Sequence, residues 1–565
     1  MSERVMNDWR DATFEVRLGP PGHGGFCVGR HEGRVVFVRH GLPGELVRVR
    51  VTEDRGGSFC RADAVEILEP SPDRVPATCP VSGPGGAGCC DFSYATPQAQ
   101  RALKASVVAE QLRRLAGIER EIVVQPITGS GDATGGWRTR IRLAVDATGR
   151  AGVHRYRSTD VIADLRCPQP VPGALDGVAD RLWTPGADLV IAVDGDGVRH
   201  IVELTPTAEG ERRKSRTSDS QRTDPGATSD RRGDQRGRDR RGRAERNDRR
   251  RPGAEPGGVR GDDDRGRKPR TDDPGARGGD DRTGTGRSAE RDNRRRPAGK
   301  PGSEWRGDDA PERGRRRRPG EIGGVWRSDA RGSGTEQSGS RIPEVPQAEE
   351  RRSASARRAA THAARDEWVI SGSGRAVEYV AGRRWEVSAT GFWQAHHGAA
   401  QCYSDLVAEW SGLLPGGLAW DLYSGAGVFA SRLAEQVGQT GAVLAVESAR
   451  SAVADGTAAL RDLPWLDLHA QRVERWVTER LGGPAPDVVV LDPPRAGAGK
   501  DVIAALAATD PTRIIHIGCD PAAFARDLAL YHSTGYHLED LRAFDAFPTT
   551  HHVECIALLK RPPPQ

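Results

Sequence analysis

The stretch AWDLYSGAGVFASRLAEQV, residues 419–437, decides the fold of the carboxyl-terminal part of this chain. Its apolar run, its glycines and its later helical spacing have the pattern of a buried strand, a tight turn and a helix. Gly425 and Gly427 would allow the backbone to approach a ligand where any side chain would collide. A tight structural turn with no ligand is the alternative interpretation.

The strand after this turn, AVLAVES, carries Glu447 at its end, about 20 residues beyond the glycines. A carboxylate at that strand end can accept both ribose hydroxyl hydrogens of an adenosine group. The turn has no third glycine and no Walker lysine, which disfavours a dinucleotide or a triphosphate. The glycine turn and the acidic strand end together favour S-adenosylmethionine.

Further apolar strands alternate with helices over residues 395–565, which predicts an α/β domain with a Rossmann-like, doubly wound and mostly parallel sheet. One strand, DVVVLDPP, leads to Asp492, and the next, RIIHIGC, ends at Cys519. At the carboxyl edge of such a sheet these side chains line the ligand crevice. A helix cap is the other interpretation of Asp492, and a buried structural cysteine is that of Cys519.

Cys519 stands in HIGCDPAAFARD, residues 516–527, where a tight turn opens a helix. Because a helix N-terminus lowers the pKa of a thiol, we expect Cys519 to be a nucleophile. The last strand follows FPTTHHVE, residues 547–554, so Glu554 meets the same sheet edge. There its carboxylate serves either as a base or as a solvated strand end.

The amino-terminal half has two further folded parts. Residues 9–69 alternate apolar with polar side chains between glycines and prolines, which predicts a small OB-like β-barrel. Residues 70–206 and 366–394 form a mixed α/β central domain. In it we expect a helix over Thr96–Gly117, capped by its first residue.

Residues 207–365 interrupt the central domain and are dominated by Arg, Asp, Gly, Pro and Ser. With few large apolar residues, the segment cannot bury enough surface to offset its conformational entropy, so we predict a long disordered insertion at a loop tip. Its arginines could contact phosphate groups. Because its acids nearly match its bases, a solvated linker is the alternative.

The 565 residues carry a net charge of +5, and nine cysteines are too few and too scattered for a secreted disulfide scaffold. The amino terminus lacks the apolar core of a signal peptide, and no run of about 18 apolar residues predicts a membrane span. We therefore expect a cytoplasmic protein without membrane association, and we infer no obligate protein partner.

Four segments, taken in order, carry a resemblance to a known family: residues 421–429, 492–495, 518–527 and 547–554. They resemble the class I, S-adenosylmethionine-dependent RNA uracil-C5 methyltransferases, which make 5-methyluridine in rRNA and tRNA. The run GPPGHGGFCVGRHEGRVVFVRHGLPGE, residues 19–45, resembles the TRAM domain, a small RNA-binding barrel, and GFWQ at 391–394 fits the same family. The resemblance implies an enzyme that methylates carbon 5 of a uridine in rRNA or tRNA.

The resemblance also implies a role for each matching residue. The residues placed against S-adenosylmethionine are Gln394, Tyr423, Glu447 and Asp492, to which the glycine turn itself adds Gly425 and Gly427. Cys519 becomes the nucleophile that adds to carbon 6 of uracil, and Glu554 becomes the base that removes the proton from carbon 5. Covalent addition splits one difficult step into two easier ones. The target base must also leave its stack to reach the pocket.

The sequence departs from the family at two places. Asp520 stands where Asn usually follows the nucleophile, and a carboxylate beside a thiol raises its pKa unless the acid is paired or points away. Some members hold a 4Fe–4S cluster, for which four thiolates are the right number. The candidates here are Cys79, Cys89, Cys90 and Cys167. Their spacing differs from the family pattern, because Ala87 stands where a cysteine is expected and two of the four are adjacent.

Two alternative functions stay open from the sequence. One is an RNA-binding or chaperone protein whose catalytic domain has decayed, for which the altered cysteine pattern and Asp520 argue. The other is methylation of carbon 5 of cytosine. The presence of Asp492, Cys519 and Glu554 argues against a decayed catalytic domain.

Overall fold

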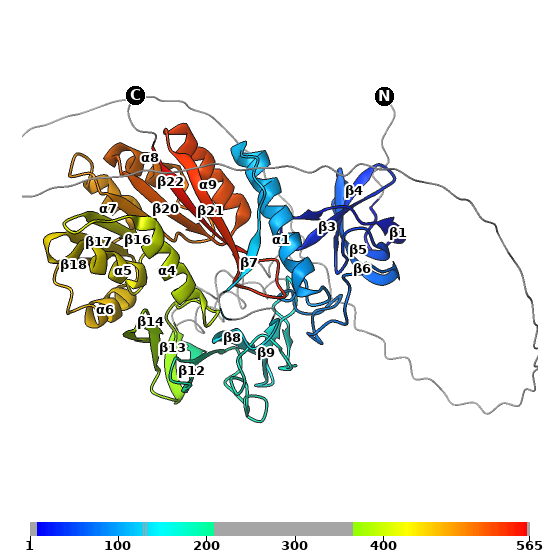
Figure 1. Cartoon of the computed structure of the whole chain (residues 1–565). Coiled ribbons are helices and arrows are strands. Elements are labelled where there is room, and N and C mark those ends of the chain that lie inside the picture. Colours follow the sequence, from blue (N-terminus) through cyan, green and yellow to red (C-terminus); the bar gives the residue numbers. More distant parts are fainter. Residues whose placement is uncertain (1–7, 128, 130–132, 208–364, 562–565) are drawn as a thin grey trace, which may run out of the picture. The chain divides into compact units, whose positions relative to one another are not determined.

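The computed structural model describes residues 8–127, 129, 133–207 and 365–561 (Figure 1). These residues form an amino-terminal barrel, a six-stranded central sheet with a separate hairpin, and an eight-stranded sheet covered by helices. The predicted disordered insertion lies outside the described residues apart from its two end residues, 207 and 365. Within the described ranges, no helix has the length and apolar character that a membrane crossing requires.

The amino-terminal barrel has six strands in the order β1-β5-β6-β4-β3-β2. They are β1 (Thr13–Arg17), β2 (Pro21–Gly22), β3 (Phe26–His31), β4 (Arg34–Arg39), β5 (Leu46–Asp54) and β6 (Phe59–Glu69). Alternate side chains such as Val36, Val38 and Val49 are fully buried, as the period of two in a strand requires. β1 runs into β2, which pairs with β3, so the chain itself joins the two ends of the sheet order. This confirms the predicted small barrel.

The predicted helix at the start of the central region is confirmed. α1 covers Pro97–Gln111 and continues as a π-helical turn over Leu112–Ala116. Thr96 caps it, since its hydroxyl accepts a hydrogen bond from the backbone N–H of Ala99 at 3.3 Å. Gly117 ends it in the left-handed conformation, with φ of 66°.

The central sheet has the strand order β10-β9-β8-β11-β12-β13. Its strands are β8 (Arg140–Val145), β9 (Ala151–His154), β10 (Val161–Ile162), β11 (Asp188–Val193), β12 (Arg199–Pro206) and β13 (Arg365–Ser371). β12 and β13 pair in antiparallel fashion, with Pro206 opposite Arg365. The chain therefore leaves this sheet and re-enters it at neighbouring positions, so the insertion joins two paired strands. A hairpin of β14 (Arg375–Val380) and β15 (Arg383–Ser388) follows.

The carboxyl-terminal sheet has the order β18-β17-β16-β19-β20-β22-β21-β7. Its strands are β16 (Leu418–Leu422), β17 (Ala442–Glu447), β18 (Leu466–Ala470), β19 (Val488–Leu491), β20 (Arg513–Gly518), β21 (His537–Asp545) and β22 (Glu554–Lys560), joined by β7. The pairs among β16 to β20 are parallel, whereas β22 runs antiparallel to both of its neighbours. The predicted Rossmann-like, mostly parallel sheet is therefore confirmed.

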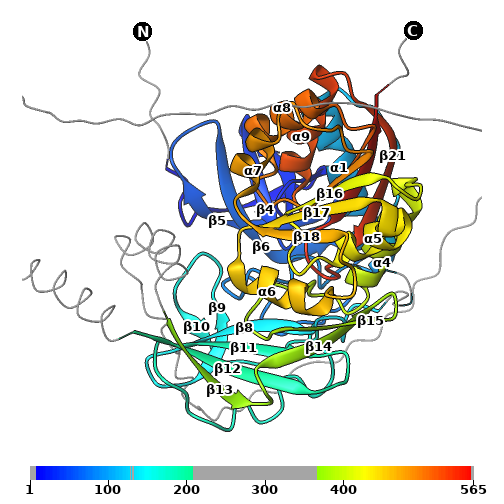
Figure 2. The ribbon, with the colours of Figure 1, turned by 90° about the vertical axis from the view of Figure 1, so that its left-hand side faces the viewer.

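Helices cover both faces of this sheet, as Figure 2 shows. They are α4 (Ala399–Ser411), α5 (Val428–Val437), α6 (Arg450–Ala459), α7 (Val473–Glu479), α8 (Gly499–Thr509) and α9 (Pro521–Ser533). One buried core contains side chains of α4 and α5, and the other contains side chains of α1, α7, α8 and α9. The sheet is thus doubly wound, with a separate apolar core on each face.

Part of the middle of the chain packs against this sheet. β7, Val124–Pro126, pairs in parallel with β21 as its edge strand. The ammonium group of Lys104 in α1 is buried and donates to the Asp545 carboxylate at 2.5 Å and to the Phe547 carbonyl at 3.0 Å. Because an unpaired buried charge is costly, this pair ties α1 to the end of β21. Neither the pairing of β7 with β21 nor the ion pair of Lys104 follows from a local sequence pattern.

We expect the fold to tolerate removal of the insertion. Replacing residues 208–364 by the loop Gly-Ser-Asn-Gly joins β12 to β13 at positions that already pair. A shorter loop costs less entropy to close, by about 0.6 kcal/mol of free energy for each halving of its length, so the free energy of unfolding should stay level or rise. Urea denaturation followed by circular dichroism measures this. A clear loss of stability would show that the insertion supports the sheet.

Candidate active site

The register of the parallel strands places several predicted residues at one level. Leu422 in β16 pairs with Val446 in β17 and with Leu491 in β19. Each strand contributes its next residue to the same carboxyl edge, and these residues are Tyr423, Glu447 and Asp492. The strand order changes direction between β16 and β19, where α/β sheets form their ligand crevice. The sheet therefore brings the three residues together at the switch point.

The glycine turn uses its two glycines for different purposes. Tyr423, Gly425 and Gly427 all have positive φ, at 62°, 55° and 81°. A Cβ atom added at Gly425 would meet nothing within 4 Å, whereas one added at Gly427 would lie 2.7 Å from the Leu460 side chain. Gly425 therefore faces open space in which a ligand can approach. Gly427 is required by the packing of the turn itself, and it caps α5.

Glu447 has a fixed carboxylate at the end of β17. Its Oε2 atom accepts a hydrogen bond from the backbone N–H of Gly425 at 3.2 Å, and its Oε1 atom accepts one from that of Ala449 at 2.7 Å. The Ser448 hydroxyl donates to the same Oε1 atom at 3.0 Å. A carboxylate has roughly four lone-pair sites, so capacity for a ligand hydroxyl is left.

Asp492 is joined to Gln394, which is distant in the sequence. The amide of Gln394 donates to the Oδ2 atom of Asp492 at 3.4 Å. Enclosure in the protein raises the pKa of the Asp492 carboxyl to about 7. The structure thus brings together two of the residues predicted to bind the cofactor.

Cys519 and Glu554 lie across from each other on neighbouring strands. Gly518 at the end of β20 pairs with Cys555 in β22, which sets the next residue, Cys519, level with Glu554. The Glu554 side chain is only 3% exposed. Burial raises the pKa of Glu554 well above its usual value, and the negative charge of Asp492 adds to the rise. A thiol and a carboxyl group therefore meet at the same sheet edge.

The prediction that a helix N-terminus lowers the pKa of the Cys519 thiol is wrong for this structure. α9 begins at Pro521 with Asp520 as its N-cap, so Cys519 lies before the helix. Burial raises the pKa of the thiol to about 12, and the charge of Glu554 contributes to this, whereas Arg495 opposes it. Burial of the thiol, followed by the charges of Glu554 and Asp492, outweighs the weak field at the helix end.

Comparisons with known proteins agree with this arrangement. Residues 416–562 match the family model described as tRNA (Uracil-5-)-methyltransferase, and residues 11–65 match the TRAM domain. An uncharacterized RNA methyltransferase of Streptomyces avermitilis is 34% identical over 97% of this chain and 98% of its own length. One of Streptomyces coelicolor is 35% identical over 97% of this chain and 92% of its own.

This chain belongs to the tRNA (uracil-5-)-methyltransferase family of RNA methyltransferases. A solved structure of similar fold is the tRNA (uracil-54, C5)-methyltransferase of Pyrococcus abyssi in complex with S-adenosyl-L-homocysteine. It is 15% identical, with a TM-score of 0.53 over 97% of this chain and all of that one. The fold of this RNA methyltransferase is accordingly that of the S-adenosylmethionine-dependent enzymes.

Sequence reasoning missed the residues that hold the loop before Glu554. The backbone N–H of Phe92 donates to the Thr549 carbonyl at 2.8 Å, and the N–H of Thr549 donates to the Gln100 side chain at 2.7 Å. His551 pairs with Asp91 at 2.5 Å through its Nδ1 atom. These partners come from the cysteine-containing segment and from α1. Asp91 directly follows Cys89 and Cys90, but no pattern in the sequence links it to His551.

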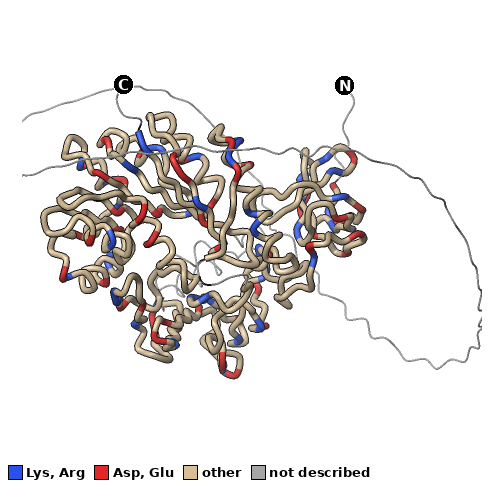
Figure 3. The backbone as a smooth tube through the Cα atoms, viewed as in Figure 1, with Lys and Arg blue, Asp and Glu red and all other residues tan. Residues whose placement is uncertain are grey.

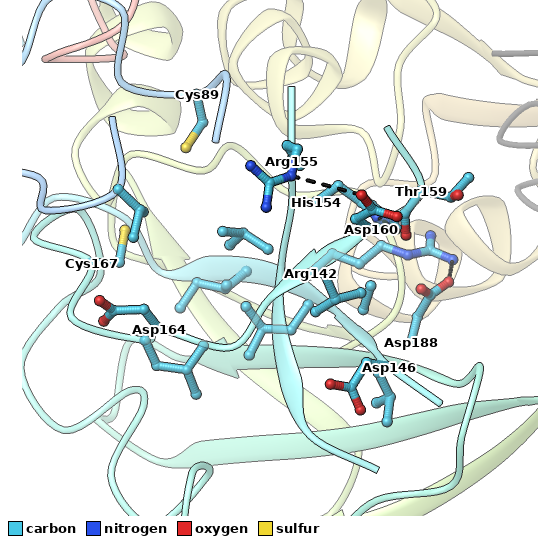
Figure 4. Close-up of a pocket in the computed structure, with 18 of the residues that line it drawn as sticks. Cys89, Arg142, Asp146, His154, Arg155, Thr159, Asp160, Asp164, Cys167 and Asp188 are labelled. Atoms are coloured by element: carbon cyan, nitrogen blue, oxygen red, sulfur yellow. Dashed lines mark hydrogen bonds and ion pairs between the residues drawn. The ribbon is translucent and has the colours of Figure 1, made fainter. Parts of the chain in front are cut away.

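The four cysteines predicted as cluster ligands gather at one place. Cys79 and Cys89 each share a thiol–thiol hydrogen bond with Cys90, which lowers the pKa of Cys79 to about 7. Cys79, Cys89 and Cys167 line a cavity of about 1160 Å³. Figure 4 shows Cys89 and Cys167 on separate segments at one side of this cavity, with Asp164 on the same side and with Asp146 and Asp188 on the opposite side.

The arrangement of these thiols does not fit a 4Fe–4S cluster. The Cys90 sulfur is buried and accepts hydrogen bonds from the amide of Gln169 at 3.2 Å and from the hydroxyl of Thr549 at 3.8 Å. In the described part of the chain, no three His, Cys, Asp or Glu side chains are placed to hold a metal ion. We therefore assign no chemical step to a cluster.

We expect Asp421→Asn to change how stability depends on pH. The carboxylate is fully buried, its Oδ2 atom accepts the N–H of Ala430 at 2.8 Å, and burial raises its pKa to about 8. Its neutral form stabilises the wild type below about pH 4, and this contribution is lost as the pH rises through 8, at roughly 1.4 kcal/mol for each pH unit between the unfolded and folded pKa values. The variant lacks this loss.

The free energy of unfolding, measured with urea at pH 5, 6, 7 and 8, tests this. Asn introduces a buried amide, so the variant should be less stable than the wild type at pH 5, and the gap should close by pH 8. The exposed carboxylate of Asp366 provides the control, since Asp366→Asn should follow the wild-type curve. Parallel curves for Asp421→Asn and the wild type would refute the buried titration.

Proposed function

We propose that this RNA methyltransferase transfers a methyl group from S-adenosylmethionine to carbon 5 of a uridine in rRNA or tRNA, while Cys519 bonds transiently to carbon 6. The observation that carries this proposal is the cross-strand placement of Cys519 level with Glu554. Asp492 lies on the neighbouring strand at the same edge. A nucleophile, a base and a carboxylate facing the ligand crevice are the parts that this reaction needs.

The residues at the switch point fit S-adenosylmethionine. Glu447 presents a fixed carboxylate suited to a ribose hydroxyl, and Gly425 borders open space. Asp492 is oriented by Gln394, and both are proposed cofactor contacts together with Tyr423. When bound, S-adenosylmethionine supplies an electrophilic methyl group on a positively charged sulfur. A positive charge near Asp492 would favour its ionised form and lower its pKa.

Cys519 acts first in the proposed reaction. Its thiol loses a proton to solvent, and the sulfur then bonds to carbon 6 of the uracil. The electrons of the carbon 5–carbon 6 double bond move onto the oxygen at carbon 4. Carbon 5 of this enolate would then bond to the methyl group as the bond between the methyl carbon and the donor's sulfur breaks, with its electron pair staying on that sulfur. Arg495 assists because its positive charge opposes the rise in the pKa of the thiol.

Glu554 acts in the second half of the reaction. Its ionised carboxylate takes the proton from carbon 5, the carbon 5–carbon 6 double bond forms again, and the bond between carbon 6 and sulfur breaks. Because burial raises the pKa of Glu554, its ionised form is a stronger base than an exposed glutamate. Asp492, which is proposed to face the methyl donor, and Glu554, the proposed base for the methylated carbon, thus come from the same edge of the sheet.

The barrel supports an RNA substrate, since the TRAM match covers residues 11–65. Along the backbone drawn in Figure 3, Lys and Arg positions are interspersed with Asp and Glu positions in the barrel and in the rest of the described chain. Phe392 is 76% exposed two positions before Gln394, and we propose that it stacks on a displaced base. RNA as substrate and nine free cysteines are consistent with our proposal of a cytoplasmic location.

We expect Cys519→Ala to reduce methyl transfer by roughly 10³-fold or more, because the covalent route is lost. The assay uses a tritiated methyl donor and RNA from a strain that lacks the gene. An RNA containing 5-fluorouridine should become attached to the wild type, because fluorine at carbon 5 cannot leave as a proton. Denaturing electrophoresis detects the attached species, and peptide mass spectrometry should place it on Cys519.

Glu554→Gln should form the attached species with ordinary RNA and release it slowly, since the base for carbon 5 is missing. The partly buried Cys402 provides the matched control, and Cys402→Ser should retain activity within about twofold. RNA binding by the wild type with no methyl transfer would favour the decayed-enzyme alternative. Mass spectrometry of the methylated nucleoside from rRNA and tRNA separates uridine from cytosine and names the RNA.

A further inference from the structure

A turn of the amino-terminal barrel reaches the residue next to the proposed nucleophile. The turn joins β2 to β3 and contains His23, followed by Gly24 and Gly25 with φ of 97° and 80°. The Nε2 atom of His23 lies 3.2 Å from the Oδ2 atom of Asp520. Both side chains are partly exposed, at 37% and 19%. The contact joins residues from opposite ends of the chain.

The path of this turn is set by close packing. A Cβ atom added at Gly25 would lie 3.1 Å from the side chain of Asp91. Asp91 in turn pairs with Arg39 of the barrel at 2.7 Å and with His551 of the loop before Glu554. The turn that carries His23 is therefore held against the same loop that leads to the proposed base.

Asp520 divides its two carboxylate oxygens between two partners. Its Oδ1 atom accepts the backbone N–H of Ala523 at 2.9 Å and so caps α9. Its Oδ2 atom faces His23. The hydrogen bond from His23, with that from Ala523, lowers the pKa of Asp520 to about 2, so the residue carries a full negative charge at neutral pH.

This charge stands one residue from a thiol that must ionise. Glu554 and Asp492 already oppose ionisation of Cys519, and Arg495 is a cation that favours it. An unpaired carboxylate at Asp520 would add a negative charge one residue from the thiol. A cation or a hydrogen-bond donor on Asp520 reduces that effect and keeps the carboxylate at the cap of α9.

We propose that His23 is a positioning residue of the barrel, which pairs with Asp520 and thereby keeps its charge from suppressing the Cys519 nucleophile. The inference rests on the proposed function, because it concerns the same sulfur. It gives the barrel a role in preparing the catalytic turn in addition to holding RNA. Asp520 acts through Cys519 and does not need to touch the substrate.

The groups that face this pair come from several elements. Asp520 faces His23 from the barrel and Arg495 from the loop after β19. Arg495 also contacts the ring of His552 at 3.0 Å. Glu554 and Asp492 face Cys519 from β22 and from the end of β19. Any pH profile of the thiol therefore includes these groups, and only a comparison between variants isolates His23.

The first test measures the reactivity of the thiol without RNA or methyl donor. Full-length wild type, His23→Ala, Asp520→Asn and the double variant are treated with iodoacetamide from pH 6 to pH 10, and peptide mass spectrometry follows alkylation of Cys519. We expect His23→Ala to react about threefold to tenfold more slowly at each pH, because an unpaired Asp520 raises the pKa of the thiol. The double variant should recover at least the wild-type rate.

His31 provides the matched control, because it lies in β3 of the same barrel and stacks on Phe14 without contacting Asp520. His31→Ala should alkylate within about twofold of the wild type. Where His23→Ala disturbs the barrel, seen by circular dichroism, His23→Gln keeps a hydrogen-bond donor and should give an intermediate rate. Equal rates for wild type and His23→Ala, or equally slow rates for His23→Ala and the double variant, would overturn the inference.

The second test measures methyl transfer with the same four proteins. We expect His23→Ala to lower kcat more than it raises KM for RNA, and we expect Asp520→Asn in the same chain to restore kcat. A loss confined to KM would assign His23 to RNA binding and contradict the positioning role. The alkylation assay tests the role of His23 separately from the proposed function, because it needs neither RNA nor methyl donor. Its outcome therefore does not depend on whether covalent methyl transfer is confirmed.

Discussion

The backbone hydrogen bonds that fix the register of β19, β20 and β22 are the constraint on which the site depends. They set Cys519 level with Glu554 and bring Asp492 to the same edge. A shift of one residue in either pair would turn one of these side chains to the other face of the sheet. The two apolar cores, one on each face, hold the register because a shift would expose buried side chains.

Burial at this edge changes the chemistry of the acids that it collects. The carboxyl groups of Asp421, Asp492 and Glu554 all have raised pKa values because they are enclosed by protein. An enclosed carboxyl group is ready to respond to a positive charge, since an opposite charge is felt more strongly in a low dielectric. The site therefore suits a positively charged methyl donor better than a neutral or anionic one.

Residues from distant parts of the sequence hold the loop that leads to Glu554. Lys104 in α1 binds the carbonyl of Phe547, Gln100 binds Thr549, and Asp91 binds His551. The barrel also takes part in these contacts, because its residue Arg39 pairs with Asp91. These buried contacts explain why the barrel and the cysteine-containing segment belong to the enzyme, and why the proposed base is not held by the carboxyl-terminal sheet alone.

Much of the fold followed from local patterns. The strand–turn–helix at 419–437, the alternating strands of the barrel and the cap at Thr96 each depend on neighbouring residues, so the sequence alone predicted them. The candidate residues at strand ends were also predictable, because parallel strands end at a common edge. The pKa of Cys519 was not, since it depends on Glu554 and on burial, which the helix-end argument omitted.

The sequence by itself determined the sheet type, the barrel and the order of the residues proposed for catalysis, because each rests on periodicity and on short motifs. Only the tertiary structure decided that β7 joins the sheet, that the four cysteines gather without a metal-binding geometry in the described residues, and that His23 reaches Asp520. These contacts join residues far apart in the sequence, and they form only when the packed cores bring the segments together.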